Sequence, residues 1–336
     1  MSFISLIIQI AITNVLGDLQ DDHGFLRHSL HTAYTSKNVS SKHHNWYSEP
    51  CTFLPQDESP LPTILISLGR SGSSVTWQTI AAMLNNRNIA YEFTGQTYHK
   101  SNRFFHDLET NPDIHYDWAL KRLCYIQNVQ SDVNSTNPGI AGFQWKPYTK
   151  GWNSAYGREA RRLMAQSETA IKIIYLVRNP LDVKLSNLKH KVAKSNGTSL
   201  GAHCPVDNQT CIHQMIKYES GYTFPVGNEL LSWLNHNKER QISIQQDLTR
   251  DNLSYVKIDY NRLYSTVDND EELAEEWMKV FRYLGRGPME GLTMKTVRKY
   301  FVMAPSHSKS KNETIRNFQQ VVSTLKGTEF EHLLRE

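Results

Sequence analysis

Several features that define large protein classes are missing from this sequence. Only four cysteines occur among 336 residues, and none form the closely spaced pairs of a zinc site. No basic tract is interleaved with aromatic residues, and the net charge of +4 is mild, so nothing in the composition indicates nucleic-acid binding. No internal repeat is visible, which argues against a repeat architecture. The hydrophobic (39%) and charged (21%) contents are those of an ordinary globular protein, and the length allows a substantial core.

A hydrophobic run long enough to cross a bilayer comfortably is missing as well. The apolar stretch at the N-terminus, Phe3–Leu16, is interrupted by polar residues. It resembles the hydrophobic region of a signal peptide, with the small residues Val15 and Gly17 before Asp18, although the usual positively charged start is absent. We interpret residues 1–17 as a signal-like or short membrane-targeting segment, which is either cleaved or kept as a membrane attachment.

Residues 18–61 are polar and rich in histidine, and they show no clear periodicity. The histidines match no usual ligand spacing, so no metal site is predicted. We expect a stem or irregular lead-in over residues 18–61 and a single folded domain over residues 62–336.

The few cysteines leave their redox state open. Cys204 and Cys211 are close enough in sequence to form a disulfide, whereas Cys51 and Cys124 could pair only if the fold brings them together. Free thiols are the alternative for all four. N-x-[ST] sequons favour passage through the secretory pathway, with the cytoplasm as the alternative location. The sequons begin at Asn38, Asn134, Asn196, Asn208, Asn252 and Asn312.

The most informative stretch of the chain is Thr63–Ala82. Ile64, Leu65 and Ile66 form an apolar run typical of a buried strand, and a helical pattern begins at Val75. A Gly/Ser loop lies between them. A strand, a loop and a helix in this order direct backbone N–H groups and the positive end of the helix at an anion. We therefore predict an anion site built from Gly69, Arg70, Ser71, Gly72, Ser73, Ser74, Val75 and Thr76.

This loop differs from the common nucleotide-binding loop. The pattern G-x-x-x-x-G-K-[ST] is absent, because no second glycine follows Gly69 at that spacing and no lysine-serine pair follows. The short loop with Arg70 suits a phosphosulfate better than a magnesium-bound triphosphate. The residues LGRSGSS resemble the 5′-phosphosulfate loop of sulfotransferases, in the arginine form found in carbohydrate enzymes.

A second stretch, Ala170–Lys189, resembles the 3′-phosphate site of the same family. A buried strand is predicted up to Val177, and Arg178 follows at its end. Asn179 and Pro180 are favourable residues at the start of a helix. Ser186 then lies about two turns into that helix. The resemblance implies that Arg178 and Ser186 hold the 3′-phosphate of the nucleotide.

Two later segments resemble the family less closely. Residues 259–263, DYNRL, are similar to its Y-E-D-L step, but Asn261 and Arg262 replace the two acidic residues. A late polar segment resembles by composition the loop that closes over the 3′-phosphate. That segment contains Ser308, Lys309, Ser310 and Lys311.

Strands that alternate with helices indicate an α/β fold, with a parallel central sheet and helices on both faces. Ligands of such folds bind beyond the carboxyl ends of the strands. The remaining strands are expected at 89–93, 139–145 and 253–258, and further helices at 158–166, from 228 onwards and at 270–284. Residues 195–225 are expected to form a loop.

The resemblance implies that the chain is an enzyme that uses 3′-phosphoadenosine 5′-phosphosulfate without a metal. Its sulfuryl group would pass to a hydroxyl of an acceptor, a glycan, in the Golgi lumen. Arg70 would stabilise the charge on the leaving phosphate. Glu92, at the end of the second strand, is the first candidate for the base and His99 the second, and Lys146 is a candidate to assist the leaving group. The alternatives are a nucleotide-dependent kinase and a non-catalytic glycan-binding relative.

Overall fold

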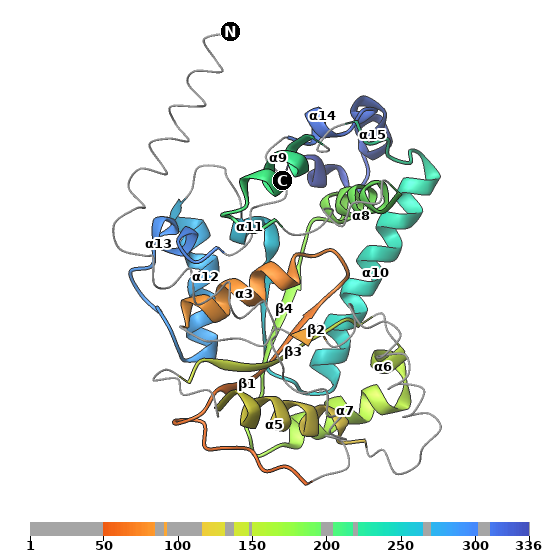
Figure 1. The fold of residues 1–336 in the computed structure, drawn as a ribbon. Helices are drawn as coiled ribbons and strands as arrows, with labels where there is room; N and C mark the ends of the chain where they lie inside the picture. The colour runs from red at the N-terminus through yellow and green to blue at the C-terminus, as the bar shows by residue number, and fades with distance from the viewer. Residues whose placement is uncertain are drawn as a thin grey trace, which may run out of the picture. The chain divides into compact units, whose positions relative to one another are not determined.

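A five-stranded parallel sheet forms the centre of the structure, a computed structural model (Figure 1). The structure describes residues 50–84, 91–92, 116–131, 138–147, 150–195, 204–217, 221–264, 270–301 and 310–335. The strands are β1 (Leu61–Ser67), β2 (Tyr91–Glu92), β3 (Ile140–Trp145), β4 (Lys172–Val177) and β5 (Tyr255–Asp259). Their order across the sheet is β2-β3-β1-β4-β5, and every pair is parallel. The predicted parallel sheet is confirmed.

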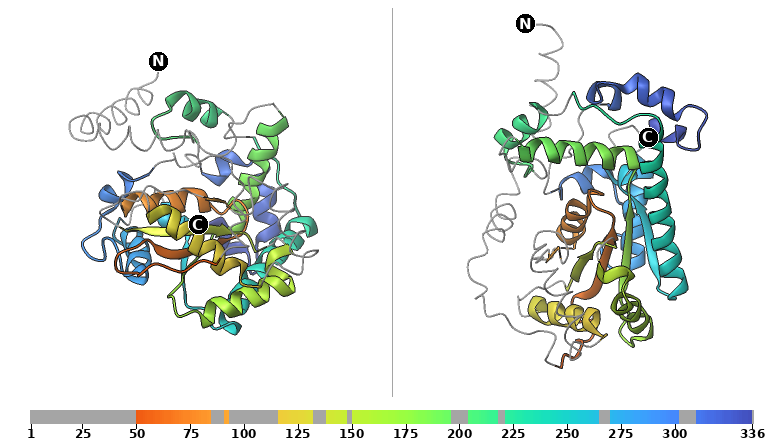
Figure 2. Two further views of the ribbon diagram at one scale, coloured as in Figure 1. Left: turned by 60° about the horizontal axis from the view of Figure 1, so that its bottom comes forward. Right: turned by 90° about the vertical axis from the view of Figure 1, so that its right-hand side faces the viewer.

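Helices cover both faces of the sheet, as predicted (Figure 2). Side chains alternate along a strand, so Leu65 of β1 points to one face while Ile64 and Ile66 point to the other. The first face packs against α3 (Ser73–Met83), α11 (Tyr260–Tyr264), α12 (Asp270–Leu284) and α13 (Met294–Arg298). The second packs against α5 (Trp118–Ser131), α6 (Lys150–Asn153), α7 (Ala155–Gln166) and α10 (Asn228–Arg250). Burial on both faces explains why β1 has a continuous apolar sequence.

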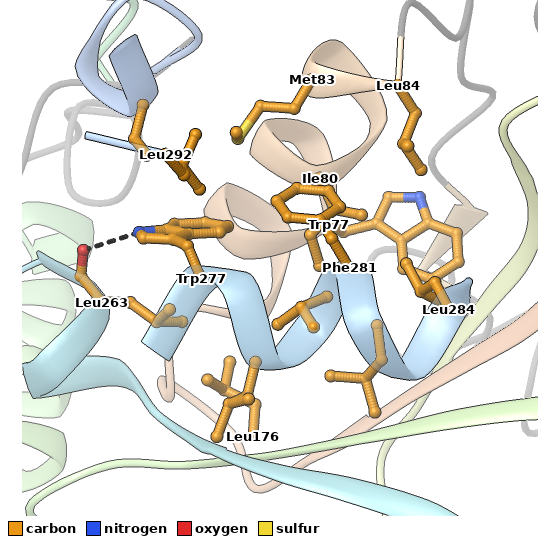
Figure 3. Close-up of a cluster of buried hydrophobic side chains, with 14 of the residues drawn as sticks. Trp77, Ile80, Met83, Leu84, Leu176, Leu263, Trp277, Phe281, Leu284 and Leu292 are labelled. Atoms are coloured by element: carbon orange, nitrogen blue, oxygen red, sulfur yellow. Dashed lines mark hydrogen bonds between the residues drawn. The ribbon is translucent and has the colours of Figure 1, made fainter. Parts of the chain in front are cut away.

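Aromatic side chains fill the layer between α3 and α12 (Figure 3). Trp77 of α3 and Trp277 and Phe281 of α12 are completely buried there. The indole Nε1 of Trp277 donates to the carbonyl oxygen of Leu263 at 3.1 Å, which ties α12 to α11. This packing fixes the position of α11, the helix that follows β5 at the carboxyl edge of the sheet.

A third apolar cluster joins the helices around this edge. It includes Leu181 and Leu185 of α8 (Pro180–Ser195) and residues of α10, α15 (Phe318–Leu325) and η2 (Glu331–Leu334). The short helix α14 (Lys311–Thr314) precedes α15, and Ile315 forms a parallel bridge with Tyr222. The C-terminal segment is thereby packed against α8, the helix that carries Ser186.

The segment between α8 and α10 is not entirely a loop. The prediction of a loop over residues 195–225 is wrong for α9 (Gln209–Lys217). Asn208 caps this helix, because its Oδ1 accepts a hydrogen bond from the amide of Cys211 at 3.0 Å. The Pro, Asp and Asn residues of this segment favour loops, but the same residue types are also common immediately before a helix.

All four cysteines form disulfides, one between Cys51 and Cys124 and one between Cys204 and Cys211. The first ties the chain before β1 to α5. Gln127 of α5 strengthens this attachment, because its Nε2 donates to Ser59 Oγ and to the carbonyl oxygen of Pro60, each at 2.9 Å. Residues 50–60 are therefore packed on the domain, within the range predicted as a stem.

The N-terminal interpretation concerns residues outside the described ranges, since residues 1–49 are among those not described. Within the described ranges, no helix combines the length and the apolar character that crossing a membrane requires.

Candidate active site

The residues predicted to form the site lie at the carboxyl ends of the five strands, along one edge of the sheet. Because the strands are parallel, their carboxyl ends meet there. Glu92 ends β2, Lys146 follows β3, the glycine loop follows β1, Arg178 follows β4 and Tyr260 follows β5. The register places Glu92 beside Gln144 and Val177 beside Asp259. Across the edge, the candidate base and the candidate 3′-phosphate site therefore lie on opposite sides of the glycine loop.

The loop after β1 has the backbone conformation that an anion site requires. Arg70 has φ 63° and Gly72 has φ 82°, both in the left-handed region. A Cβ on Gly72 would lie 2.0 Å from Cε2 of Tyr260, so a side chain at this position cannot fit. The first backbone bond of α3 runs from the amide of Thr76 to the carbonyl oxygen of Gly72 at 3.0 Å. The preceding amides, from residues 73 to 75, have no partner within the helix and are available to an anion.

Lys146 is buried against the back of this loop. Its side chain is only 2% exposed, and its Nζ donates to Ser67 Oγ at 2.9 Å and to Ser73 Oγ at 2.5 Å. Ser67 ends β1 and Ser73 begins α3, so the ammonium group joins both ends of the loop to β3. A lysine charge is thus placed beside the first turn of α3, where a helix already favours an anion.

Two hydrogen bonds join the two predicted anion sites. Arg178 donates from Nη1 to the carbonyl oxygen of Arg70 at 3.0 Å. In the other direction, Arg70 donates from Nε to Ser186 Oγ at 3.2 Å. The guanidinium carbon of Arg178 also lies 4.2 Å from the ring centre of Tyr260. The loop and the β4–α8 junction therefore form one continuous site.

The start of α8 is held by residues that explain a departure from the family pattern. The amide of Asn179 donates to Oδ1 of Asn261 at 3.2 Å. Nδ2 of Asn261 in turn donates to Asp182 Oδ2 at 2.6 Å. An acidic residue at position 261 would set one carboxylate against another, whereas an amide can both donate and accept.

The C-terminal segment reaches the same place. Lys311 Nζ lies 3.8 Å from Oδ1 of Asp182, one turn before Ser186 in α8. Ser310 forms a capping box with Glu313 at the start of α14. Lys311 of the predicted closing segment thus lies beside the first turn of α8, while Ser308 and Lys309 are outside the described residues.

The remaining residues predicted for the loop differ in how far they are buried. Thr76 is completely buried, and one turn further along α3 the hydroxyl of Thr79 accepts a hydrogen bond from that of Tyr264 at 3.4 Å in the core. Burial, and then the neighbouring Tyr260, raise the pKa of Tyr264 far above its usual range. Ser71, Ser73 and Val75 are also buried, whereas Gly69, Arg70, Gly72 and Ser74 are partly exposed.

Two of the catalytic candidates stay predictions. Only the backbone of Glu92 belongs to the described structure, and His99 lies outside it. The sequence pattern assigned no site role to Ser67, and it marked Tyr260 only as part of the stretch similar to the Y-E-D-L step. Each stands at a strand end beside a predicted site, and that position is the signal by which they could have been found.

Comparison with known proteins identifies the family of the chain. The sequence model of a family described as "Sulfotransferase domain" matches residues 60–326, from the start of β1 to the end of α15. None of the curated proteins compared with the chain matches it. The match covers the sheet, the glycine loop, Lys146, the Arg178 site and Lys311. This chain therefore belongs to the sulfotransferase family.

Proposed function

We propose that this sulfotransferase takes its sulfuryl group from 3′-phosphoadenosine 5′-phosphosulfate and transfers it to a hydroxyl group of a carbohydrate. One observation carries the choice of donor. Arg70 and Lys146 stand at the glycine loop, while Arg178 and Ser186 form a second group joined to it by two hydrogen bonds. Two adjacent cationic groups suit a nucleotide with phosphates at both its 5′ and 3′ positions.

The residues present fit this donor. The first amides of α3 and the Arg70 side chain would bind the 5′ end. Gly72 lets the loop pack directly against Tyr260, because a Cβ there would collide with the ring. Arg178, with its planar fork of donors, would bind the 3′-phosphate together with Ser186. The donor, when bound, supplies a sulfuryl group attached to a phosphate leaving group.

Side chains of the protein would stabilise the negative charge that forms on the leaving phosphate and would accept the proton of the acceptor hydroxyl. Negative charge grows on the leaving phosphate, and preformed cations and N–H groups lower the barrier when they already point there. Arg70 and Lys146 occupy that place, and Lys146 is held by two serine hydroxyls. Glu92, on the other side of the loop, would accept the proton of the acceptor hydroxyl.

The acceptor and the location are proposed on separate grounds. The arginine form of the loop favours a carbohydrate acceptor. Two disulfides that use all four cysteines favour an oxidising compartment, and with the sequons they support the Golgi lumen and a glycoprotein. Membrane attachment through residues 1–17 belongs to the same proposal.

We expect the protein to bind adenosine 3′,5′-bisphosphate at least tenfold more tightly than 5′-AMP or ATP, since Arg178 and Ser186 add a charged contact worth more than about 1.4 kcal/mol. Isothermal titration calorimetry with the three nucleotides measures this preference directly. Equal affinity for the bisphosphate and 5′-AMP would contradict the proposed donor.

Assays of the same protein distinguish a sulfotransferase from a nucleotide-dependent kinase. Binding of the bisphosphate and transfer of labelled sulfate to a glycan mixture should persist in a chelator, because Arg70 and Lys146 supply the positive charge. Magnesium-dependent transfer of labelled phosphate from ATP instead of sulfate, together with tighter binding of ATP than of the bisphosphate, would support a kinase. Bisphosphate binding without transfer to any glycan or tyrosine-containing peptide would instead favour the non-catalytic relative.

A further inference from the structure

Three of the six N-x-[ST] sequons lie in the part of the chain that the structure describes. They begin at Asn208, Asn252 and Asn312, and all three asparagines are exposed. A sequon can carry a glycan in the folded protein only where the bulky sugar has room at the surface. The contacts of each asparagine and its position on the fold therefore distinguish the three.

The sequon at Asn252 has both of its functional side chains in solvent. Asn252 and Ser254, its first and last residues, are exposed, and neither side chain forms a hydrogen bond within the described structure. The residue between them, Leu253, is 8% exposed and packs into the apolar cluster on the second face of the sheet. The carbonyl oxygen of Ser254 accepts from the hydroxyl of Tyr283 at 2.7 Å. Buried neighbours thus hold this turn while its amide and hydroxyl groups stay accessible.

The backbone at Asn252 is fixed independently of its side chain. Asn252 has φ 55° and follows the last turn of α10, a position where asparagine is one of the few residues besides glycine that fit. Its amide donates to the carbonyl oxygen of Thr249 at 3.1 Å, and the amide of Leu253 donates to that of Leu248 at 2.9 Å. A group attached to Nδ2 of Asn252 would break none of these bonds.

The other two asparagines take part in local structure. Oδ1 of Asn208 accepts from the amide of Cys211 and caps α9 inside a disulfide loop. Oδ1 of Asn312 accepts from the hydroxyl of Ser310. Its neighbour Lys311 reaches α8, so a glycan on Asn312 would lie beside the candidate active site. Among the described sequons, only the one at Asn252 combines an unbonded asparagine with a position away from that site.

The fold places Asn252 far from the carboxyl edge of the sheet. Asn252 precedes the start of β5, so the length of that strand, about 15 Å, separates it from the edge where the site lies. The start of α10 packs in the third apolar cluster with α8, and its 23 residues then extend about 35 Å toward the other end of the sheet (Figure 1). A glycan on Asn252 would therefore leave the donor and acceptor sides open.

We propose that Asn252 carries an N-linked glycan. The proposal rests on the lumenal location proposed above, where an oligosaccharide carried on a lipid pyrophosphate is the sugar donor. Nδ2 of Asn252 forms a bond to C1 of the oligosaccharide as the C1–O bond to the pyrophosphate breaks. The pyrophosphate leaves with the electron pair, and the amide nitrogen loses one proton. The exposed turn after α10 then accommodates the product without rearrangement.

The test uses the full chain made in a eukaryotic cell, once unaltered and once with a secretion signal added before residue 1. Enzymatic release of N-glycans converts each carrying asparagine to aspartate, which peptide mass spectrometry detects. We expect this conversion at Asn252. Asn252→Gly, which suits the positive φ, and Ser254→Ala should each lose one glycan, whereas Ser254→Thr should keep it. Calorimetry should show unchanged affinity of Asn252→Gly for adenosine 3′,5′-bisphosphate.

The outcomes separate the glycan from the location. Conversion at Asn252, with the same loss in Asn252→Gly and Ser254→Ala, supports the site. An unmodified Asn252 in the chain with the added signal overturns it, as does a glycan that Ser254→Ala retains. Weaker bisphosphate binding in both glycan-free variants overturns the separation from the donor site. If Asn252 is modified only when the signal is added, the site is supported and the proposed lumenal location fails.

Discussion

The Arg178→Ala variant should bind adenosine 3′,5′-bisphosphate about 30- to 1000-fold more weakly than the wild type, a loss of roughly 2–4 kcal/mol. Arg178 is 4% exposed, so its charge is held out of water at the place where the 3′-phosphate is expected. Removing it would leave a phosphate partly buried without its partner. Affinity for 5′-AMP, which lacks that phosphate, should change much less. Calorimetry with both nucleotides checks the result.

Two further variants show whether the effect is specific. Arg178→Lys keeps the charge but loses the planar fork that contacts the Arg70 carbonyl group, so its affinity should lie between those of wild type and Arg178→Ala. Arg158 is an exposed arginine on α7, which covers the sheet away from the glycine loop. Arg158→Ala therefore removes the same charge without removing a proposed ligand. If Arg158→Ala weakened bisphosphate binding equally, general electrostatic attraction would replace the assigned contact.

The Glu92→Gln variant should lower kcat about 100-fold or more, the span of general-base catalysis, while bisphosphate affinity stays unchanged. Glu92 ends β2 in register with Gln144 of the neighbouring strand β3, and Lys146 follows directly after that strand. An acceptor approaching that end would meet Glu92 on the side of the loop opposite Arg178. Glutamine has the same shape but cannot accept the proton. Steady-state kinetics with a glycan acceptor measures the loss.

The dependence of the rate on pH gives an independent check. A carboxylate base works only when deprotonated, so kcat/KM of the wild type should fall as the pH drops below the pKa of that base. The residual activity of Glu92→Gln should lack this acidic decline. His99→Ala should keep near-full activity. If His99→Ala lost activity while Glu92→Gln kept it, the base would be His99.

The local sequence was sufficient to predict the two strand-to-helix turns at which we propose that anions bind. The apolar run of β1 ends at a loop in which Gly72 adopts a positive φ, and Asn179 with Pro180 starts α8. Oδ1 of Asn179 accepts from the amide of Leu181 at 2.9 Å, as the cap prediction requires. These features are readable because neighbouring residues alone determine them: strand hydrophobicity, glycine conformational freedom and helix capping.

The contacts that join these turns could be seen only in three dimensions. Lys146 bonds to Ser67 and Ser73 across 79 and 73 residues of sequence, and Arg70 bonds to Ser186 across 116. Tyr260 follows the edge strand β5, two strands away from β1, and fills the space beside Gly72. Such partners depend on strand order and register, which local propensity does not specify.

The cysteines and Asn261 also show the difference between what the local sequence determines and what only the tertiary structure reveals. The spacing of Cys204 and Cys211 already allowed a disulfide, but Cys51 and Cys124 pair because α5 packs next to the chain that enters β1. Asn261 departs from the family's acidic residue, and the reason is visible only once Asp182 is seen beside it. Sequence by itself therefore determined the fold class, the two strand-to-helix turns and the family, because short-range chemistry encodes them. The tertiary structure decided which distant side chains complete the site, because only the packed sheet brings them within hydrogen-bonding distance.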